Sequence, residues 1–326
     1  MILNEGDVPA IVAAGQTPGK TYTPIAHFNG TFNGNGKTIS GLYISQPTTS
    51  QVALFKAMGG SASDFRLINS YIEGGDTVAG IVGRASGTVE NIYCDATIVS
   101  KGDIAVYNGG IVGQVWDGTL TINNCWYDGT MEIYRVSNNG LTIVSGGILG
   151  ANVQGTATIT NCLYSGQINT TSYAWNLYLG GINGGTGIQY NGNPHASQCA
   201  KTTIDGCIST GGFKTESTND GRVAAILGDS WNDSNADNAT AVITNCYAMK
   251  EIWKYSSNIE ETASTEGIKP LAEMKNDQLQ GLDMAYWIYI QGGTPELRSF
   301  IKGTAYVAED TQITGGTIGS GETVNQ

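Results

Sequence analysis

The chain has 326 residues, of which 46 are Gly, 40% are hydrophobic and only 13% are charged. This apolar content suffices for a substantial core and excludes an intrinsically disordered chain, because disordered chains are highly charged and poor in apolar residues. The net charge of −12 argues against nucleic acid as a partner. The sequence has no apolar run approaching the roughly 18 residues that a membrane span needs, so we expect no membrane insertion.

Residues 1–27 are expected to cap the N-terminal end of a repeat region that occupies residues 28–250. Within that region two short phrases alternate. The first is Gly-Gly-Ile-Val-Gly or a close variant, and its central positions are Ile81, Ile111, Ile148, Ile182 and Ile226. The second is Ile-x-Asn-Cys or a close variant, and its last positions are Ile92, Cys125, Cys162, Cys207 and Cys246.

These repeats predict an all-β solenoid. Short β-branched runs between Gly and Asn are typical of strands. A single copy cannot bury an apolar face alone, so successive copies must stack, and strands that pair through such long connections are parallel. We therefore predict a parallel β-helix of about seven coils, with an N-terminal cap and a small helix-containing C-terminal cap.

Stacking would align equivalent residues in columns. The Ile column is expected to point inward. An Asn column would adopt the left-handed conformation and bond through its amides to the coils above and below; its members are Asn91, Asn124, Asn161 and Asn245, with Gly206 in one coil. The Cys column is interpreted as stacked small hydrophobes, with an inter-coil disulfide or a metal site as alternatives. Cys94 aligns with Tyr127 and Tyr164, and Cys199 lies in an insertion, where a disulfide or a free thiol remains open.

Residues 251–300 are expected to form the C-terminal cap. Residues 270–280 read as a short helix, since Pro is tolerated in a first turn and Gly281 suits the end of a helix. Leu271, Met274 and Leu279 would pack this helix against the last coil, and Trp287 would fill the same junction. Residues 301–326 would be a linker, a further strand or the start of another module.

Residues 23–44, TPIAHFNGTFNGNGKTISGLYI, closely resemble the opening of GLUG-motif β-solenoids. The two repeated phrases are similar to that family too, as are residues 271–276, 284–288 and 292–298. The resemblance implies a right-handed β-helix that is secreted or anchored at a bacterial cell surface. Such modules occur in adhesin-type proteins and beside the protease domain of some immunoglobulin A-specific metallopeptidases. The resemblance carries over no catalytic residue, because the shared motifs are structural.

Two insertions, at about 184–203 and 228–241, fall on one edge of the predicted solenoid. Adjacent long loops on a rigid scaffold are a plausible place for binding. Aromatic faces suit sugar rings, so the ligand-binding candidates in these variable connections are Tyr173, Trp175, Tyr190, His195 and Trp231. The alternative is that these side chains pack inward beneath the loops.

The second insertion also supplies the candidate metal ligands, Asp229, Asp233 and Asp237. Their alternation is that of calcium loops, but the Gly and the final Glu of such a loop are missing, and Thr244 stands where that Glu would be. Calcium is therefore one hypothesis, and a solvated acidic loop is the other. No other cofactor is expected.

From these observations we expect a non-catalytic, extracellular module of a bacterial cell-surface protein. It would serve adhesion or spacing, bind a glycan or a host surface protein, and form part of a larger multidomain chain. The alternative is a polysaccharide lyase or glycoside hydrolase, because many β-solenoids act on polysaccharides. Glycosidases generally use two carboxylates, and we expect no acidic residue in a shared column of the repeats. An ice-binding Thr array is disfavoured by Val242 in that column and by the uneven coil lengths.

Overall fold

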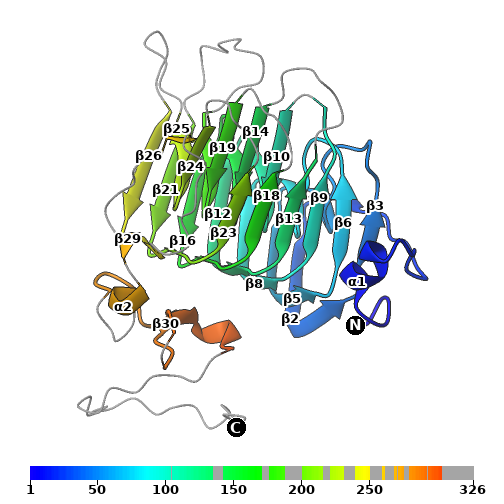
Figure 1. Cartoon of the computed structure of the whole chain (residues 1–326), viewed down its shortest axis with the longest axis horizontal. Coiled ribbons are helices and arrows are strands. Elements are labelled where there is room, and N and C mark those ends of the chain that lie inside the picture. Colours follow the sequence, from blue (N-terminus) through cyan, green and yellow to red (C-terminus); the bar gives the residue numbers. More distant parts are fainter. Residues whose placement is uncertain are drawn as a thin grey trace.

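The computed structural model describes residues 1–103, 105–134, 142–170, 176–187, 200–215, 221–230, 239–249, 259–260, 268–269, 271–274, 279–291 and 293–302. These residues form a parallel β-helix, as the repeats predict (Figure 1). Each of the first six coils contributes strands in turn to a seven-stranded, an eleven-stranded and a six-stranded sheet, and the described strands of the seventh coil join only the first two of these. A five-stranded sheet is added after the third coil. All pairings within these four sheets are parallel, between one coil and the next.

The strands of each sheet follow one another along the stack. The seven-stranded sheet contains β1 (Ile25–Phe28), β4 (Phe55–Met58), β7 (Val82–Ala85), β11 (Val112–Val115), β15 (Leu149–Asn152), β20 (Asn183–Thr186) and β25 (Leu227–Ser230). The eleven-stranded sheet contains β2 (Thr31–Ser40), β5 (Ser61–Ile68), β8 (Gly87–Cys94), β12 (Thr119–Tyr127), β16 (Thr156–Thr160), β17 (Leu163–Tyr164), β21 (Lys201–Asp205), β22 (Ile208–Ser209), β26 (Thr240–Thr244), β27 (Tyr247–Met249) and β29 (Ile268–Lys269).

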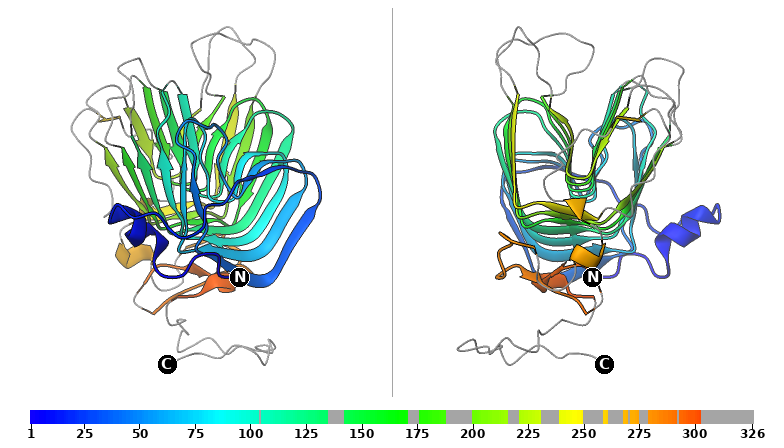
Figure 2. Two further views of the ribbon diagram at one scale, coloured as in Figure 1. Left: turned by 90° about the vertical axis from the view of Figure 1, so that its right-hand side faces the viewer. Right: turned by 60° about the vertical axis from the view of Figure 1, so that its left-hand side comes forward.

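The other two sheets complete the circuit. The six-stranded sheet contains β3 (Tyr43–Ser45), β6 (Tyr71–Gly74), β9 (Thr97–Ser100), β13 (Thr130–Ile133), β18 (Gln167–Thr170) and β23 (Gly212–Thr215). The five-stranded sheet contains β10 (Ala105–Gly109), β14 (Thr142–Gly146), β19 (Asn176–Gly180), β24 (Gly221–Ala224) and β28 (Ile259–Glu260). In the right-hand view of Figure 2, close to a view along the stack, successive coils follow nearly the same path.

The predicted columns are present. The Ile column lies inside the solenoid, and Ile81 N donates to Ile111 O at 3.2 Å, as Ile111 N does to Ile148 O at 3.2 Å. The Cys column is a single buried file of free thiols, in which Cys162 N donates to Cys207 Sγ at 3.4 Å. The described cysteines are free and buried among apolar side chains, which fits the small-hydrophobe interpretation, and burial raises the pKa of the Cys207 thiol. Cys199 lies outside the described residues.

The Asn column adopts the left-handed conformation as expected, with φ near +50° at Asn124 and +62° at Gly206. Its hydrogen bonds are less regular than a continuous amide ladder. Asn124 Nδ2 donates to Asn91 Oδ1 at 2.8 Å, but Asn161 Nδ2 donates instead to Asn123 Oδ1 at 3.1 Å. The left-handed backbone conformation at the corner of each coil therefore accounts for the Asn column. The Asn side chains bond to different acceptors on the neighbouring coils.

Tyr127 and Tyr164 stack inside the core, with ring centroids 6.4 Å apart and planes 7° from parallel. Their rings press on the glycines of the first phrase. A Cβ at Gly110 would lie 2.1 Å from the Tyr127 ring, and one at Gly147 would lie 2.4 Å from the Tyr164 ring. The second Gly of the phrase is thus required by the opposite sheet, which the phrase by itself does not reveal, whereas a Cβ at the first Gly, Gly109, would lie 1.8 Å from the Val112 carbonyl oxygen of its own turn.

The N-terminal residues cover part of the first coil. Ile2 pairs with Ser40 of β2, and Tyr22 N donates to the Tyr43 carbonyl of β3 at 2.9 Å. Between them lies helix α1 (Val8–Ala13), whose first turn is capped by Asp7 through a 3.0 Å bond from Ala10 N to Oδ1. Val8 is buried and its N–H donates to Asn69 Oδ1 at 3.0 Å. The helix is thereby fixed beside β6 (Figure 1).

The C-terminal residues meet the last coil as expected, where Tyr247 Oη donates to the Gln280 carbonyl at 2.6 Å, but they also extend further. Helix α2 is described as Leu271–Met274 and is followed by residues 279–291 and 293–302, here named the C-terminal strap. The strap contains an antiparallel pair, β30 (Trp287–Ile288) and β31 (Glu296–Leu297), and the 3-10 helix η3 (Arg298–Phe300). It does not stop at the last coil but runs back beneath the stack in the view of Figure 1.

The reason is an apolar column on the outer face of the eleven-stranded sheet. Register places Tyr93, Trp126, Leu163 and Ile208 in one file, pointing away from the core. The strap and α2 cover them with side chains that include Met274, Leu279, Trp287, Leu297 and Phe300. Trp287 is completely buried, and its Nε1 donates to the Gly206 carbonyl at 3.0 Å. The strap therefore supplies the second layer that an apolar outer face needs in water.

The left-handed Asn corner yields a first prediction. We expect Asn161→Ala to lower the free energy of unfolding more than Asn161→Gly, because a Cβ-bearing residue other than Asn costs about 1–2 kcal/mol in this conformation and Gly does not. Both variants lose the bond to Asn123, so their difference isolates the backbone, and Gly206 is the natural precedent. Denaturant unfolding would measure it; equal destabilisation by Ala and Gly would contradict the interpretation.

Candidate functional site

Most of the site residues predicted from the sequence cannot be placed. Tyr173, Trp175, Tyr190, His195, Trp231, Asp233 and Asp237 all lie outside the described residues. Asp229 is described at the end of β25 and is 7% exposed. Its Oδ2 lies 2.6 Å from Nη1 of Arg222 on β24, so its carboxylate joins the seven-stranded and five-stranded sheets. The described residues contain no group of three or more His, Cys, Asp or Glu that could hold a metal, and calcium binding stays a prediction.

A groove of about 740 Å³ lies between helix α1 and the outer face of the six-stranded sheet. Strand alternation builds its floor. Ile72 and Ile98 point into the core, and their neighbours point outward into the groove. The outward residues of β6, β9 and β13 and of the segments after them are Tyr71, Thr97, Val99, Lys101, Thr130, Glu132 and Tyr134, and Pro9, Ala10 and Val12 form the opposite wall.

The carboxylates in and beside this groove each have fixed partners. Lys101 Nζ lies 2.5 Å from Glu73 Oε1, and Ser45 Oγ donates to Glu73 Oε2 at 2.5 Å. Glu73 is 7% exposed, so its burial depends on these two partners. Asn169 Nδ2 donates to Glu132 Oε1 at 2.7 Å. The groove thus offers charged and polar groups in fixed positions.

The aromatic residues of the groove are partly open to solvent. Tyr134 is 39% exposed, and Tyr71 packs against Tyr43 with ring centroids 5.9 Å apart. Burial raises the pKa of both the Tyr71 and Tyr134 phenols, and the nearby carboxylates of Glu73 and Glu132 raise them further. Both hydroxyls therefore stay protonated at neutral pH and can donate hydrogen bonds. The sequence search missed this groove because α1 is far from β13 in the chain.

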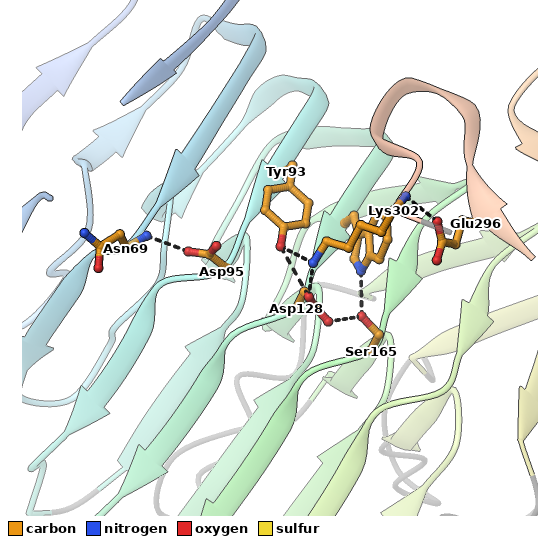
Figure 3. Close-up of polar contacts among 8 residues, drawn as sticks. Asn69, Tyr93, Asp95, Asp128, Ser165, Glu296 and Lys302 are labelled. Carbon is orange, nitrogen blue, oxygen red and sulfur yellow. Dashed lines mark hydrogen bonds and ion pairs between the residues drawn. The ribbon is translucent and has the colours of Figure 1, made fainter. Parts of the chain in front are cut away.

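A second constellation lies on the outer face of the eleven-stranded sheet, beneath the strap (Figure 3). The Tyr93 and Trp126 rings stand almost perpendicular, with centroids 5.4 Å apart and planes at 88°. Nζ of Lys302, on the strap, lies 4.6 Å from the Tyr93 centroid and 4.9 Å from the Trp126 centroid. The same ammonium is paired with the Asp128 carboxylate. Lys302 Nζ also donates to Tyr93 Oη at 2.5 Å, so one ring face, that of Trp126, one hydroxyl and one carboxylate surround a single cation.

Hydrogen bonds orient the anion of this constellation. Trp126 Nε1 donates to Ser165 Oγ at 2.6 Å, and Ser165 Oγ in turn donates to Asp128 Oδ1. Tyr93 Oη donates to Asp128 Oδ2 at 3.2 Å. On the strap, the Lys302 N–H donates to Glu296 at 2.6 Å, which fixes the backbone that carries the lysine.

The register also corrects an expectation about acidic residues. Cys94 pairs with Tyr127, so the next residues, Asp95 and Asp128, occupy neighbouring positions on adjacent coils. The repeats therefore do place carboxylates in a shared column. Asp95 accepts a 2.7 Å bond from Asn69 N. Burial raises the pKa of the Asp95 carboxyl, and the charges of Asp128 and Asp7 also raise it, against lowering by the Asn69 bond and Lys302.

This raised pKa predicts a pH-dependent stability. An Asp carboxyl in the unfolded chain has a pKa of about 3.9, and the folded state holds the Asp95 proton more tightly than that. The contribution of Asp95 to the free energy of unfolding therefore falls as the pH rises from about 3.9 through the pKa of the folded state. We expect Asp95→Asn to be more stable than wild type at pH 7 and equally stable below pH of about 3.9, in urea titrations.

The amide oxygen introduced by Asp95→Asn can still accept the bond from Asn69 N. Asp117→Asn is the matched control, because the Asp117 side chain is 72% exposed and its 3.2 Å pair with Arg84 lies at the surface, where such a pair contributes little. A stability gain for Asp95→Asn that does not change with pH would contradict the assignment.

Comparison with known proteins supports the fold. No model of a known protein family matches the chain. The chain is 33% identical over 104 residues to halomucin from Haloquadratum walsbyi; the match covers 30% of this chain and about 1% of halomucin. The fold is similar to that of a candidate immunoglobulin A1 protease from Bacteroides ovatus, with a TM-score of 0.52 and 18% identity over 86% of this chain and 88% of the other. At that identity the likeness establishes the fold alone. Among the described residues no helix is long and apolar enough to cross a membrane.

Proposed function

We propose that this chain is a non-catalytic, extracellular β-helical module of a bacterial cell-surface protein of the GLUG-motif kind, and that it binds a glycan in the groove beside α1. The observation that carries the proposal is the groove itself, where Tyr71 and Tyr134 lie among hydroxyls and fixed charges. The sequence match to halomucin supports a surface role.

The chemistry of the groove favours a sugar over a protein partner. A sugar ring has an apolar face that packs on an aromatic ring and a rim of hydroxyls that need hydrogen-bond partners. Tyr134 offers an exposed ring, and Thr97 and Thr130 offer hydroxyls beside it. A volume of about 740 Å³ falls within the range of about 300–1,000 Å³ that is usual for small-molecule sites, and it suits a few sugar rings.

The carboxylates of the groove favour binding over hydrolysis. A glycosidase needs one carboxyl that can give up a proton and another that can attack or activate water. Glu73 is held by Lys101 and Ser45, and Glu132 accepts a bond from Asn169. The adjacent carboxylates of Asp95 and Asp128 lie beneath the strap, where Lys302 is paired with Asp128. The polysaccharide-active alternative therefore has less support than binding.

A glycan array with quantitative follow-up tests this function. We expect Tyr134→Ala to weaken the binding of any captured glycan by roughly threefold to tenfold, since an aromatic contact contributes about 0.5–1.5 kcal/mol. Trp116→Ala is the control, because Trp116 has nearly the same exposure, 38% against 39%, but follows a strand of the seven-stranded sheet. Failure to bind any glycan, or an equal loss in the Trp116 variant, would contradict the proposal and favour a spacer.

A further inference from the structure

The constellation beneath the strap has the features of a receptor for an organic cation. Its parts all come from the coils. Tyr93 lies on β8, Trp126 on β12, and Asp128 and Ser165 follow strands of neighbouring coils. Only the cation, Lys302, comes from the strap. The receptor and its occupant are therefore separate parts of the chain.

The geometry provides two kinds of attraction for one ammonium group. The Tyr93 and Trp126 rings stand at right angles and form a corner, in which the Lys302 nitrogen lies 4.9 Å from the Trp126 centroid and donates to Tyr93 Oη at 2.5 Å. A cation over an aromatic face is stabilised by the ring quadrupole, the more so when partly desolvated. The Asp128 carboxylate then adds charge-assisted hydrogen bonding.

The carboxylate is positioned independently of the lysine. Ser165 and Tyr93 donate to its two oxygens, and Trp126 Nε1 donates to Ser165 Oγ. These bonds connect coil residues only, so the receptor keeps its anion when the lysine leaves. A preorganised receptor of this kind has an affinity of its own for an ammonium ion.

We propose that Tyr93, Trp126 and Asp128 form a binding site for primary alkylammonium groups, which in this chain is occupied by Lys302. The lysine of the strap is then a tethered and replaceable ligand. The effective concentration of a tethered group is in the millimolar range or above, which excludes weak free competitors while the strap is docked. The lysine of a neighbouring polypeptide would compete for the same corner.

The test removes the tethered ligand and supplies a free one. In Lys302→Ala the corner is vacant, and n-butylammonium is the probe. We expect saturable binding with a dissociation constant on the order of millimolar. The readout is the NMR signal of the Trp126 indole N–H, which lies in the hydrogen-bond chain to Asp128. Comparison with Trp126→Phe assigns that signal.

Three controls make the result specific. Lys302→Met fills the corner with an uncharged side chain. We expect Lys302→Met and wild type to bind n-butylammonium at least tenfold more weakly than Lys302→Ala does. Asp128→Asn in the Lys302→Ala background should also weaken binding at least tenfold. The uncharged probe n-butanol, which has a similar size and shape, should leave the Trp126 signal of Lys302→Ala unchanged.

The state of the strap is read separately from the Trp287 indole N–H, which donates to Gly206. Because the receptor consists of coil residues, the titration remains valid whether or not Lys302→Ala keeps the strap docked. The proposal is overturned if folded Lys302→Ala gives no saturable shift with n-butylammonium, or if the Asp128→Asn double variant or n-butanol gives the same shift.

Discussion

The structure depends on one constraint, which is that each coil pairs in parallel register with the next through backbone hydrogen bonds. Ile81, Ile111 and Ile148 continue this bonding from coil to coil at the turn of the first phrase. Once the backbone is in register, every side chain meets the equivalent side chain of its neighbours. The residues of one column therefore share the same surroundings, so each must suit the same face of the stack.

The same constraint explains the two features outside the core. Register makes the outer face of the eleven-stranded sheet apolar along Tyr93, Trp126 and Leu163, and this stripe must be covered. The strap covers it and brings Lys302 to the carboxylate of Asp128. On the six-stranded sheet the outer face is mixed in polarity, and α1 stands off from it, which leaves the groove.

The internal repeats made the fold predictable from the sequence. The spacing of the two phrases predicted parallel coils, the inward Ile and Cys files and the left-handed Asn corner, and all of these are present. The alignment of Cys94 with Tyr127 was also correct, yet its consequence one residue later, the neighbouring Asp95 and Asp128, was overlooked. The Asp column extends over only these two coils, so it becomes visible only when the register is known residue by residue.

The sequence by itself determined the architecture, because a repeated pattern of apolar, Gly and Asn positions admits only a stack in which each copy buries its neighbour. Only the tertiary structure decided where the non-repeating segments lie. Helix α1 and the strap meet sheet faces whose residues are distant in the chain, as Lys302 meets Tyr93. Such contacts depend on the shape and polarity of a surface assembled from several coils, and no periodicity in the chain encodes them.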